Sequence, residues 1–231
     1  MSLHLRSRDV DLGGGLIVRR VLPQRALRKV GPWVFVDHFG PAEGVVDPER
    51  DVRPHPHCGL STVSSLFEGA TEHRDSTGGE GTIRAGEVQR MSAGTGVMHS
   101  EYNASQNDEV HFLQIWILPD KENHKPGYEQ KHYTETERRG KLRLVASGDS
   151  RNGSVHINRD ADMFAGLFQR GEEAKHKLAS GRLGWLHVAK GAVHINGSLL
   201  HAGDGVAFET SEEVHIHDGE NAEVLLFDMA Y

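Results

Sequence analysis

The chain has one cysteine, Cys58, and no apolar run long enough to cross a bilayer. A single cysteine excludes an internal disulfide and any cysteine-rich zinc or iron–sulfur site. A membrane-spanning helix needs about 20 consecutive apolar residues, so no membrane contact is expected. Residues 1–10 lack the apolar core of a secretory signal. We therefore expect a soluble, cytoplasmic protein.

Positive charge is also scarce, with 26 Lys and Arg against 33 Asp and Glu and a formal net charge of −7. Affinity for nucleic acid comes largely from clustered Lys and Arg, so direct binding to nucleic acid is not expected. The glycines of residues 78–87 are not followed by the Lys-Ser/Thr of a phosphate-binding loop. No nucleotide, flavin or haem motif is present, and we expect no organic cofactor.

Glycine and histidine are abundant instead: 27 and 16 of the 231 residues. The glycine content exceeds the usual ~7% and suits many tight turns. Short apolar runs bounded by Gly, Asp, Asn and Pro predict an all-β sandwich or barrel. The expected strands are 16–22, 33–39, 61–67, 88–93, 110–118, 142–146, 184–189, 192–196, 205–209, 213–217 and 222–229. Helix signals are weak, and only 160–169 is expected to form one or two helical turns.

An internal repeat relates residues 66–101 to residues 188–217. Both copies read strand, Gly turn, strand, a turn containing Ala-Gly-Glu or Ala-Gly-Asp, and strand. Two half-length copies predict two antiparallel β-barrel domains, 1–138 and 139–231, with the polar segment 119–140 as connector. The termini can cross over to pack on the other barrel. The alternative is two hairpins that share turn chemistry by chance, because Gly turns recur in β proteins.

Four residues in two pairs are candidates for metal binding: His55 and His57 in RPHPHCG, and His99 and Glu101 in GVMHSEYN. Residues two apart on a strand point to the same face. Two such strands facing each other inside a barrel would place three imidazoles and one carboxylate around a point. Nitrogen and oxygen ligands with open positions suit Fe(II) oxygen chemistry. A single pair of this kind is more often polar packing, but the second pair favours a metal.

These motifs carry a family resemblance. The stretch PHPHCGLSTVSSLFEG, followed by HRDS and IRAGEVQRMSAGTGVMHSE, resembles the pirin family of the cupin superfamily. The resemblance runs from about residue 31 to residue 118, and the RRVLP and PWVFVDHF segments fit it too. It implies a bicupin of two face-to-face β-barrels with one mononuclear metal site in the N-terminal barrel. The family's ligands, three His and one Glu, fall on His55, His57, His99 and Glu101.

The resemblance also implies function. Bacterial members include quercetin 2,3-dioxygenases, whereas the animal member is a nuclear, iron-bound transcriptional co-regulator. We expect one divalent transition metal, Fe(II) in the cell, with Ni, Zn or Mn replacing it in recombinant material. The favoured function is a dioxygenase that opens a flavonol-like ring with O₂, in which Glu101 also takes the substrate's 3-hydroxyl proton. The alternative is a metal-binding regulator that docks on a protein partner; the ligand motif does not separate the two.

The second copy lacks the first ligand pair. Placing residues 66–69 on 188–191 sets Lys177 and Ala179 against His55 and His57, so the C-terminal barrel is expected to be metal-free despite its His215 and His217. We expect ordinary structural roles for the other candidates: Glu68 at a turn or on the surface, His73 and Asp75 in surface or loop hydrogen bonds, Cys58 as a buried thiol, and Met91, Met98 and Trp116 in the core.

Overall fold

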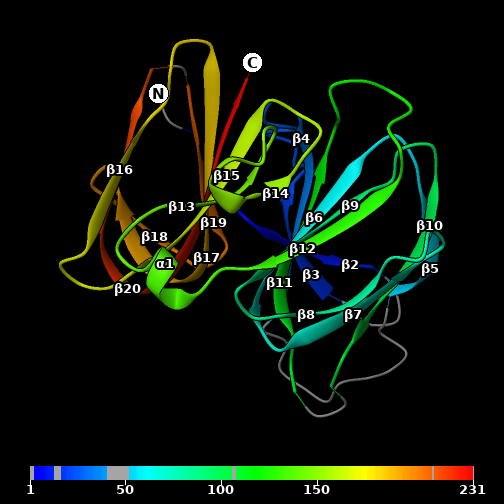
Figure 1. Cartoon of the computed structure of the whole chain (residues 1–231). Helices are drawn as coiled ribbons and strands as arrows, with labels where there is room; N and C mark the ends of the chain where they lie inside the picture. Colours follow the sequence, from blue (N-terminus) through cyan, green and yellow to red (C-terminus); the bar gives the residue numbers. More distant parts are fainter. Residues whose placement is uncertain (1–2, 13–16, 41–51, 106–107, 210, 231) are drawn as a thin grey trace.

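The computed structural model describes residues 3–12, 17–40, 52–105, 108–209 and 211–230, and most of these form β-strands (Figure 1). The first half contains β1 Leu3–Arg6, β2 Arg8–Asp11, β3 Ile17–Leu22, β4 Trp33–Phe39, β5 Val52–His57, β6 Ser61–Glu68, β7 Ala70–Asp75, β8 Glu80–Arg84, β9 Glu87–Ser92, β10 Val97–Asn103, β11 His111–Ile117 and β12 Gly127–His132. The second half contains α1 Glu135–Arg138, β13 Arg143–Ser147, a 3₁₀ turn Arg151–Gly153, β14 Val155–His156, β15 Ala161–Phe168, β16 Glu173–Lys177, β17 Arg182–Ile195, β18 Ser198–His201, β19 Asp204–Phe208 and β20 Glu213–Ala230. The all-β prediction is confirmed.

The strands form three sheets in two halves that lie side by side (Figure 1). A seven-stranded sheet, β12-β9-β6-β11-β4-β3-β2, and a four-stranded sheet, β5-β10-β7-β8, make the N-terminal half. A nine-stranded sheet follows the order β1-β19-β17-β20-β15-β13-β14, with β16 added on β20 and β18 on β17. Strand β1 therefore pairs with β19 of the C-terminal half, so the N-terminal segment does cross over. A domain boundary at 138/139 stays a prediction.

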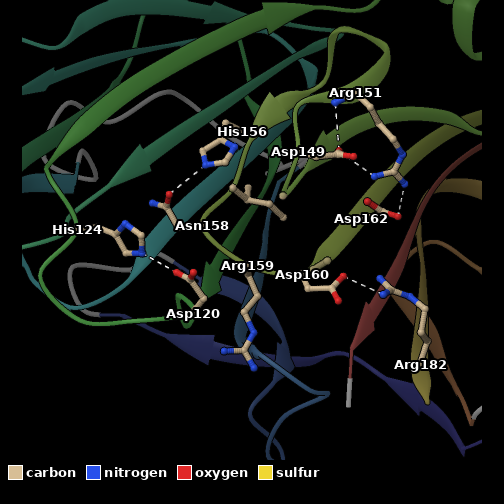
Figure 2. Close-up of a pocket in the computed structure, with 13 residues that line it drawn as sticks. Asp120, His124, Asp149, Arg151, His156, Asn158, Arg159, Asp160, Asp162 and Arg182 are labelled. Carbon is tan, nitrogen blue, oxygen red and sulfur yellow. Dashed lines mark hydrogen bonds and ion pairs between the residues drawn. The ribbon is translucent and has the colours of Figure 1, made fainter.

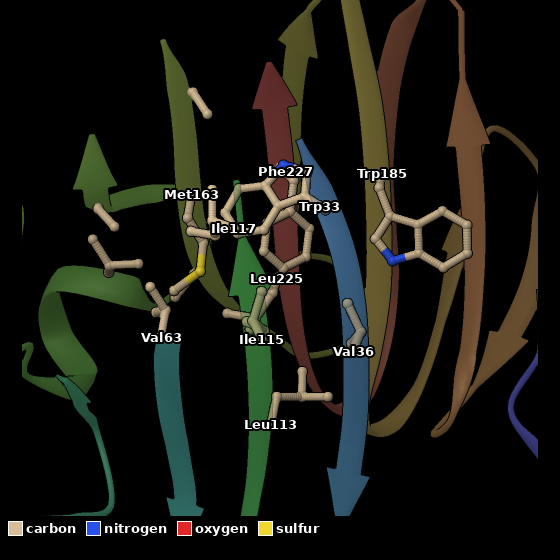
Figure 3. Packing of buried hydrophobic residues seen from close by; sticks show 14 of the residues in the cluster. Trp33, Val36, Val63, Leu113, Ile115, Ile117, Met163, Trp185, Leu225 and Phe227 are labelled. Atoms are coloured by element: carbon tan, nitrogen blue, oxygen red, sulfur yellow. The ribbon is translucent and has the colours of Figure 1, made fainter. Parts of the chain in front are cut away.

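The main apolar core lies between the two halves (Figure 3). On β11, Leu113, Ile115 and Ile117 point into this layer and are at most 1% exposed. Phe227 of β20 meets Trp33 of β4 with ring centroids 4.6 Å apart. Because side chains alternate along a strand, the other face of β11 is turned into the N-terminal half.

The two halves differ in their interiors. The C-terminal half encloses an apolar cluster that includes Leu178, Val214 and Ile216, all fully buried. The apolar cluster inside the N-terminal half is small, built on Leu66, Ile83 and Phe112. Polar side chains, including those of His73, His99 and Glu101, occupy much of the remaining interior of the N-terminal half.

Three local predictions were wrong. Residues 160–169 contain strand β15, not a helix, because Ala161–Phe168 pairs along its whole length with β20. The segment 119–140 is not only a connector, since Gly127–His132 pairs with β9. Cys58 is exposed, not buried. The helices in the part of the chain that is described are too short and too polar to span a membrane.

Candidate metal centre

Three neighbouring strands of the four-stranded sheet, β5, β10 and β7, bring polar pairs together. Each pair is spaced i, i+2 and shares one face of its strand. The pairs are His55 and His57 on β5, His99 and Glu101 on β10, and His73 and Asp75 on β7. His99 lies opposite His55 on one side and opposite Asp75 on the other. The ligand strands β5 and β10 are hydrogen-bonded neighbours in one sheet, so they do not face each other inside a barrel as expected.

The three predicted histidine ligands converge through one nitrogen each. Nε2 of His55 lies 3.0 Å from Nε2 of His57 and 3.0 Å from Nε2 of His99. With metal–nitrogen bonds of about 2.1 Å, ligands at right angles lie about 3.0 Å apart, and tetrahedral ligands about 3.4 Å apart. The spacing is therefore compatible with nitrogen ligands of one divalent transition ion.

The surroundings of His57 and His99 lower the pKa values of both rings, which favours the neutral form that binds a metal cation. Burial, reinforced by the neighbouring histidines, lowers the pKa of His57 to about 4 and that of His99 to about 3. Both rings are consequently neutral near pH 7. A neutral imidazole has one nitrogen without a proton, which is the form that binds a metal.

Glu101 is buried beside His99 and is held by a polar chain from the seven-stranded sheet. Gln114 Nε2 donates to Glu101 Oε2 over 3.2 Å, and Ser64 Oγ donates to Gln114 Oε1 over 2.5 Å. Burial raises the pKa of Glu101 to about 7. A cation close to this carboxyl would favour its ionised form.

The predicted ligands fall into two overlapping groups. The ligand atoms of His55, His57 and His99 lie within 4.8 Å of one another, and those of His73, His99 and Glu101 do so as well. His99 is common to both groups. The three predicted histidines therefore meet at one point, and Glu101 is grouped with His99 and with His73, a residue that was not predicted as part of the site.

Several neighbours of the site were assigned the wrong role from sequence. His73 is on a strand and is fully buried, not in a surface loop. Trp116 is half-buried; its ring meets the His57 ring at 5.1 Å and stacks on Phe35 at 4.4 Å. Met98, expected in the core, is 46% exposed. Side chains alternate along β11, so Gln114 and Trp116 share one face of that strand. This alternation is the sequence signal that could have placed Gln114 and Trp116 beside the site.

The C-terminal half offers a direct comparison through its strand register. Val214 lies opposite His176 there, as His99 lies opposite His55 in the N-terminal half. The corresponding residues for His55, His57, His99 and Glu101 are thus His176, Leu178, Val214 and Ile216. The alignment based on the Gly turns was wrong by one residue for the first pair. His176 Nε2 contacts Asp228 at 2.7 Å, and the other three positions are apolar and fully buried.

A separate cavity of about 510 Å³ lies over the C-terminal half and the connector (Figure 2). Two arginines that line it form ion pairs: Arg151 with Asp149 and Asp162, and Arg182 with Asp160. It shares no residue with the two histidine groups. Its charges are largely compensated, so it is not the candidate centre.

Comparison with known proteins agrees with the fold. A family model described as Pirin matches residues 15–117, and one described as Quercetinase C-terminal cupin domain matches residues 144–229. The quercetin 2,3-dioxygenase of Escherichia coli K12 is 37% identical over 187 residues, which cover 81% of this chain and 80% of that protein. A pirin-like protein of Caulobacter vibrioides is 34% identical over 186 residues, 80% of each chain.

Solved structures match along the whole length. The bacterial pirin YhhW from Escherichia coli, crystallised in complex with nickel(II), superposes with a TM-score of 0.88 at 30% identity, covering 100% of this chain and 99% of that one. Both expected cupin domains are thereby confirmed. With this coverage and identity, the chain belongs to the pirin family of two-domain cupin proteins.

Proposed function

We propose that this protein is a metal-dependent dioxygenase that opens a flavonol-like, quercetin-type ring with O₂. The observation that carries the proposal is the convergence of three imidazole Nε2 atoms, with that of His55 3.0 Å from those of His57 and His99, beside a buried carboxyl group. The identity with a relative named quercetin 2,3-dioxygenase supports the substrate class.

The proposed ligands of one divalent transition ion are His55, His57, His99 and Glu101. We expect Fe(II) in the cell, and Ni, Zn or Mn in recombinant protein, since occupancy follows availability as well as geometry. When bound, the ion would supply Lewis acidity and open positions for a chelating phenol and for O₂. A site whose positions were all filled by protein ligands would serve structure alone.

The protein's own groups bind the substrate and move its proton. Glu101 would accept the proton of the flavonol 3-hydroxyl if its carboxylate loosens from the ion, and Gln114 holds that carboxylate through its amide N–H. Burial raises the pKa of Glu101 to about 7 in the metal-free site, and a nearby cation would favour the carboxylate, which is the form that accepts a proton. Trp116, beside His57, offers a flat surface on which an aromatic ring can stack. Loss of the proton makes the ring electron-rich and open to attack by O₂, with ring opening and release of CO.

The test is aerobic incubation of Fe(II)-loaded protein with quercetin, following the flavonol absorbance and CO. We expect turnover that falls by about 10²–10⁴-fold in Glu101→Gln, the loss typical of a removed general base. His55→Ala and metal chelation should abolish it, whereas the control His215→Ala, altered at a partly exposed residue of β20, should keep it. Turnover that survives chelation would contradict the proposal. Absence of turnover, together with metal-dependent capture of a protein partner, would favour the regulator alternative.

A further inference from the structure

We propose that His73 and Asp75 are positioning residues that fix the tautomer of His99, so that its Nε2 faces the ion and no proton blocks it. This inference rests on the metal site proposed above but not on any reaction with quercetin. It assigns a role to a fully buried dyad that the ligand set leaves unused.

The proton positions follow from the contacts, starting at Asp75. His73 Nε2 lies 3.0 Å from Asp75 Oδ2. An ionised carboxylate only accepts hydrogen bonds, so Nε2 of His73 must carry the proton. In a neutral ring the other nitrogen, Nδ1, is then an acceptor.

The chain continues to the ligand. His73 Nδ1 lies 3.5 Å from His99 Nδ1. Since His73 Nδ1 accepts, His99 Nδ1 is the donor, and His99 Nε2 keeps its lone pair. That nitrogen is the one 3.0 Å from His55 Nε2. A carboxylate–histidine chain behind a metal ligand is the usual way in which proteins fix ring orientation and tautomer.

The Asp75 carboxylate is itself held in place. Its Oδ1 accepts hydrogen bonds from Thr77 N at 2.7 Å, Thr77 Oγ1 at 2.6 Å and Gly79 N at 3.0 Å. A side chain at Gly79 would not fit, because its Cβ would lie 2.2 Å from Asp75 Oδ2. Four donors converge on this one carboxylate when His73 is included, which is the environment of an ionised, acceptor-only group.

The same geometry argues against His73 as a ligand. An ion bound to His99 Nε2 lies across the ring from Nδ1, the atom that faces His73. An ion shared by His73 and His99 Nδ1 would give up His55, which faces Nε2. The ring of Tyr128, with its centroid 4.8 Å from that of His73, fixes the plane of the imidazole.

The experiment measures Ni(II) binding by calorimetry and imidazole tautomers by NMR. In His73→Leu, which removes the acceptor, we expect Ni(II) affinity to fall about 10- to 100-fold. In His73→Asn, whose amide oxygen can take the place of Nδ1, affinity should return to within about 3-fold of the wild type. The reference variant His57→Ala should lose the site.

Each outcome decides between roles. If His73 is a ligand, both His73 variants will lose Ni(II) as severely as His57→Ala; if it has no role, neither will change. Long-range ¹H–¹⁵N spectra are recorded on the metal-free wild type, so this measurement does not depend on whether a variant folds. They should show the proton of His99 on Nδ1 and that of His73 on Nε2, and the opposite pattern overturns the proposal. If the Ni(II) affinities and the tautomers are as expected but the protein does not turn over quercetin, only the proposed function is contradicted.

Discussion

Glu68 and Lys190 form an ion pair that joins the two halves of the molecule, and they occupy the same position in the two repeats. Each is the residue before the Gly turn, Gly69 or Gly191. The Glu68 carboxylate also lies 3.6 Å from Nδ1 of the buried His111. The turn residue expected from sequence is therefore part of the contact between halves.

This ion pair should contribute little to stability. The side chains of Lys190 and Glu68 are 33% and 45% exposed, and pairs with such access to water are usually worth at most about 1 kcal/mol. We expect Glu68→Gln to lower the free energy of unfolding by less than about 1 kcal/mol, and Phe227→Ala, in the apolar layer, to lower it by about 3–5 kcal/mol. Urea denaturation of both variants checks this; a larger loss in Glu68→Gln would make the ion pair the dominant contact.

Acid should weaken the contact between the halves through three buried histidines, His38, His111 and His187. Burial lowers the pKa of His187 to about 3 and holds those of His38 and His111 below their ordinary values. An unfolded histidine binds a proton below about pH 6.5, so the unfolded state takes up more protons as the pH falls. The contribution of these neutral histidines to the free energy of unfolding is fully present above about pH 6.5. It is lost progressively as the pH falls towards 3.

The measurement is urea unfolding of metal-free protein between pH 7 and pH 4. Each buried neutral histidine adds up to about 1.4 kcal/mol of loss per pH unit in this range. We expect His187→Gln to reduce the slope by about that amount and His132→Gln, at an exposed residue, to leave it unchanged. Identical slopes in all three proteins would show that His187 is not neutral when folded.

The metal content of the protein should depend on His55, His57 and His99. We expect about one metal ion per chain in the wild type and nearly none in the double variant His57→Ala, His99→Ala, because the two remaining ligands, His55 and Glu101, cannot hold the ion. Elemental analysis after dialysis checks this. His215→Ala, which alters the C-terminal half, should keep the wild-type content; equal metal in the double variant and the wild type would refute the ligand assignment.

Trp116 should affect substrate affinity more than chemistry. Its ring stacks on Phe35 next to His57, and an aromatic contact of this kind is worth about 0.5–1.5 kcal/mol. For Trp116→Leu we expect KM for quercetin to rise about 3- to 10-fold, with kcat and metal content little changed. Steady-state kinetics on samples of equal metal content test this. An unchanged KM would place the substrate ring elsewhere.

The sequence by itself determined the all-β fold class, the internal repeat and the two i, i+2 pairs, His55 with His57 and His99 with Glu101. These are local properties: alternation along a strand decides which side chains share a face, whatever the strand pairs with. For this reason the three histidines that meet at Nε2 could be named without a structure. The same spacing named Glu101 as a fourth candidate, and the resemblance of residues 31–118 to the pirin family then supplied the chemistry.

Strand pairing decided the rest. His73 and Asp75 are an i, i+2 pair as visible as the others, but their burial depends on β7 lying beside β10. Residues 160–169 became a strand because β20, some sixty residues later, supplies their hydrogen-bond partners. Tertiary contacts override weak local propensity in this way, since a strand satisfies its backbone only through another segment. Which faces meet, and hence which polar groups lie behind the ligands, is a property of the pairing and not of any one segment.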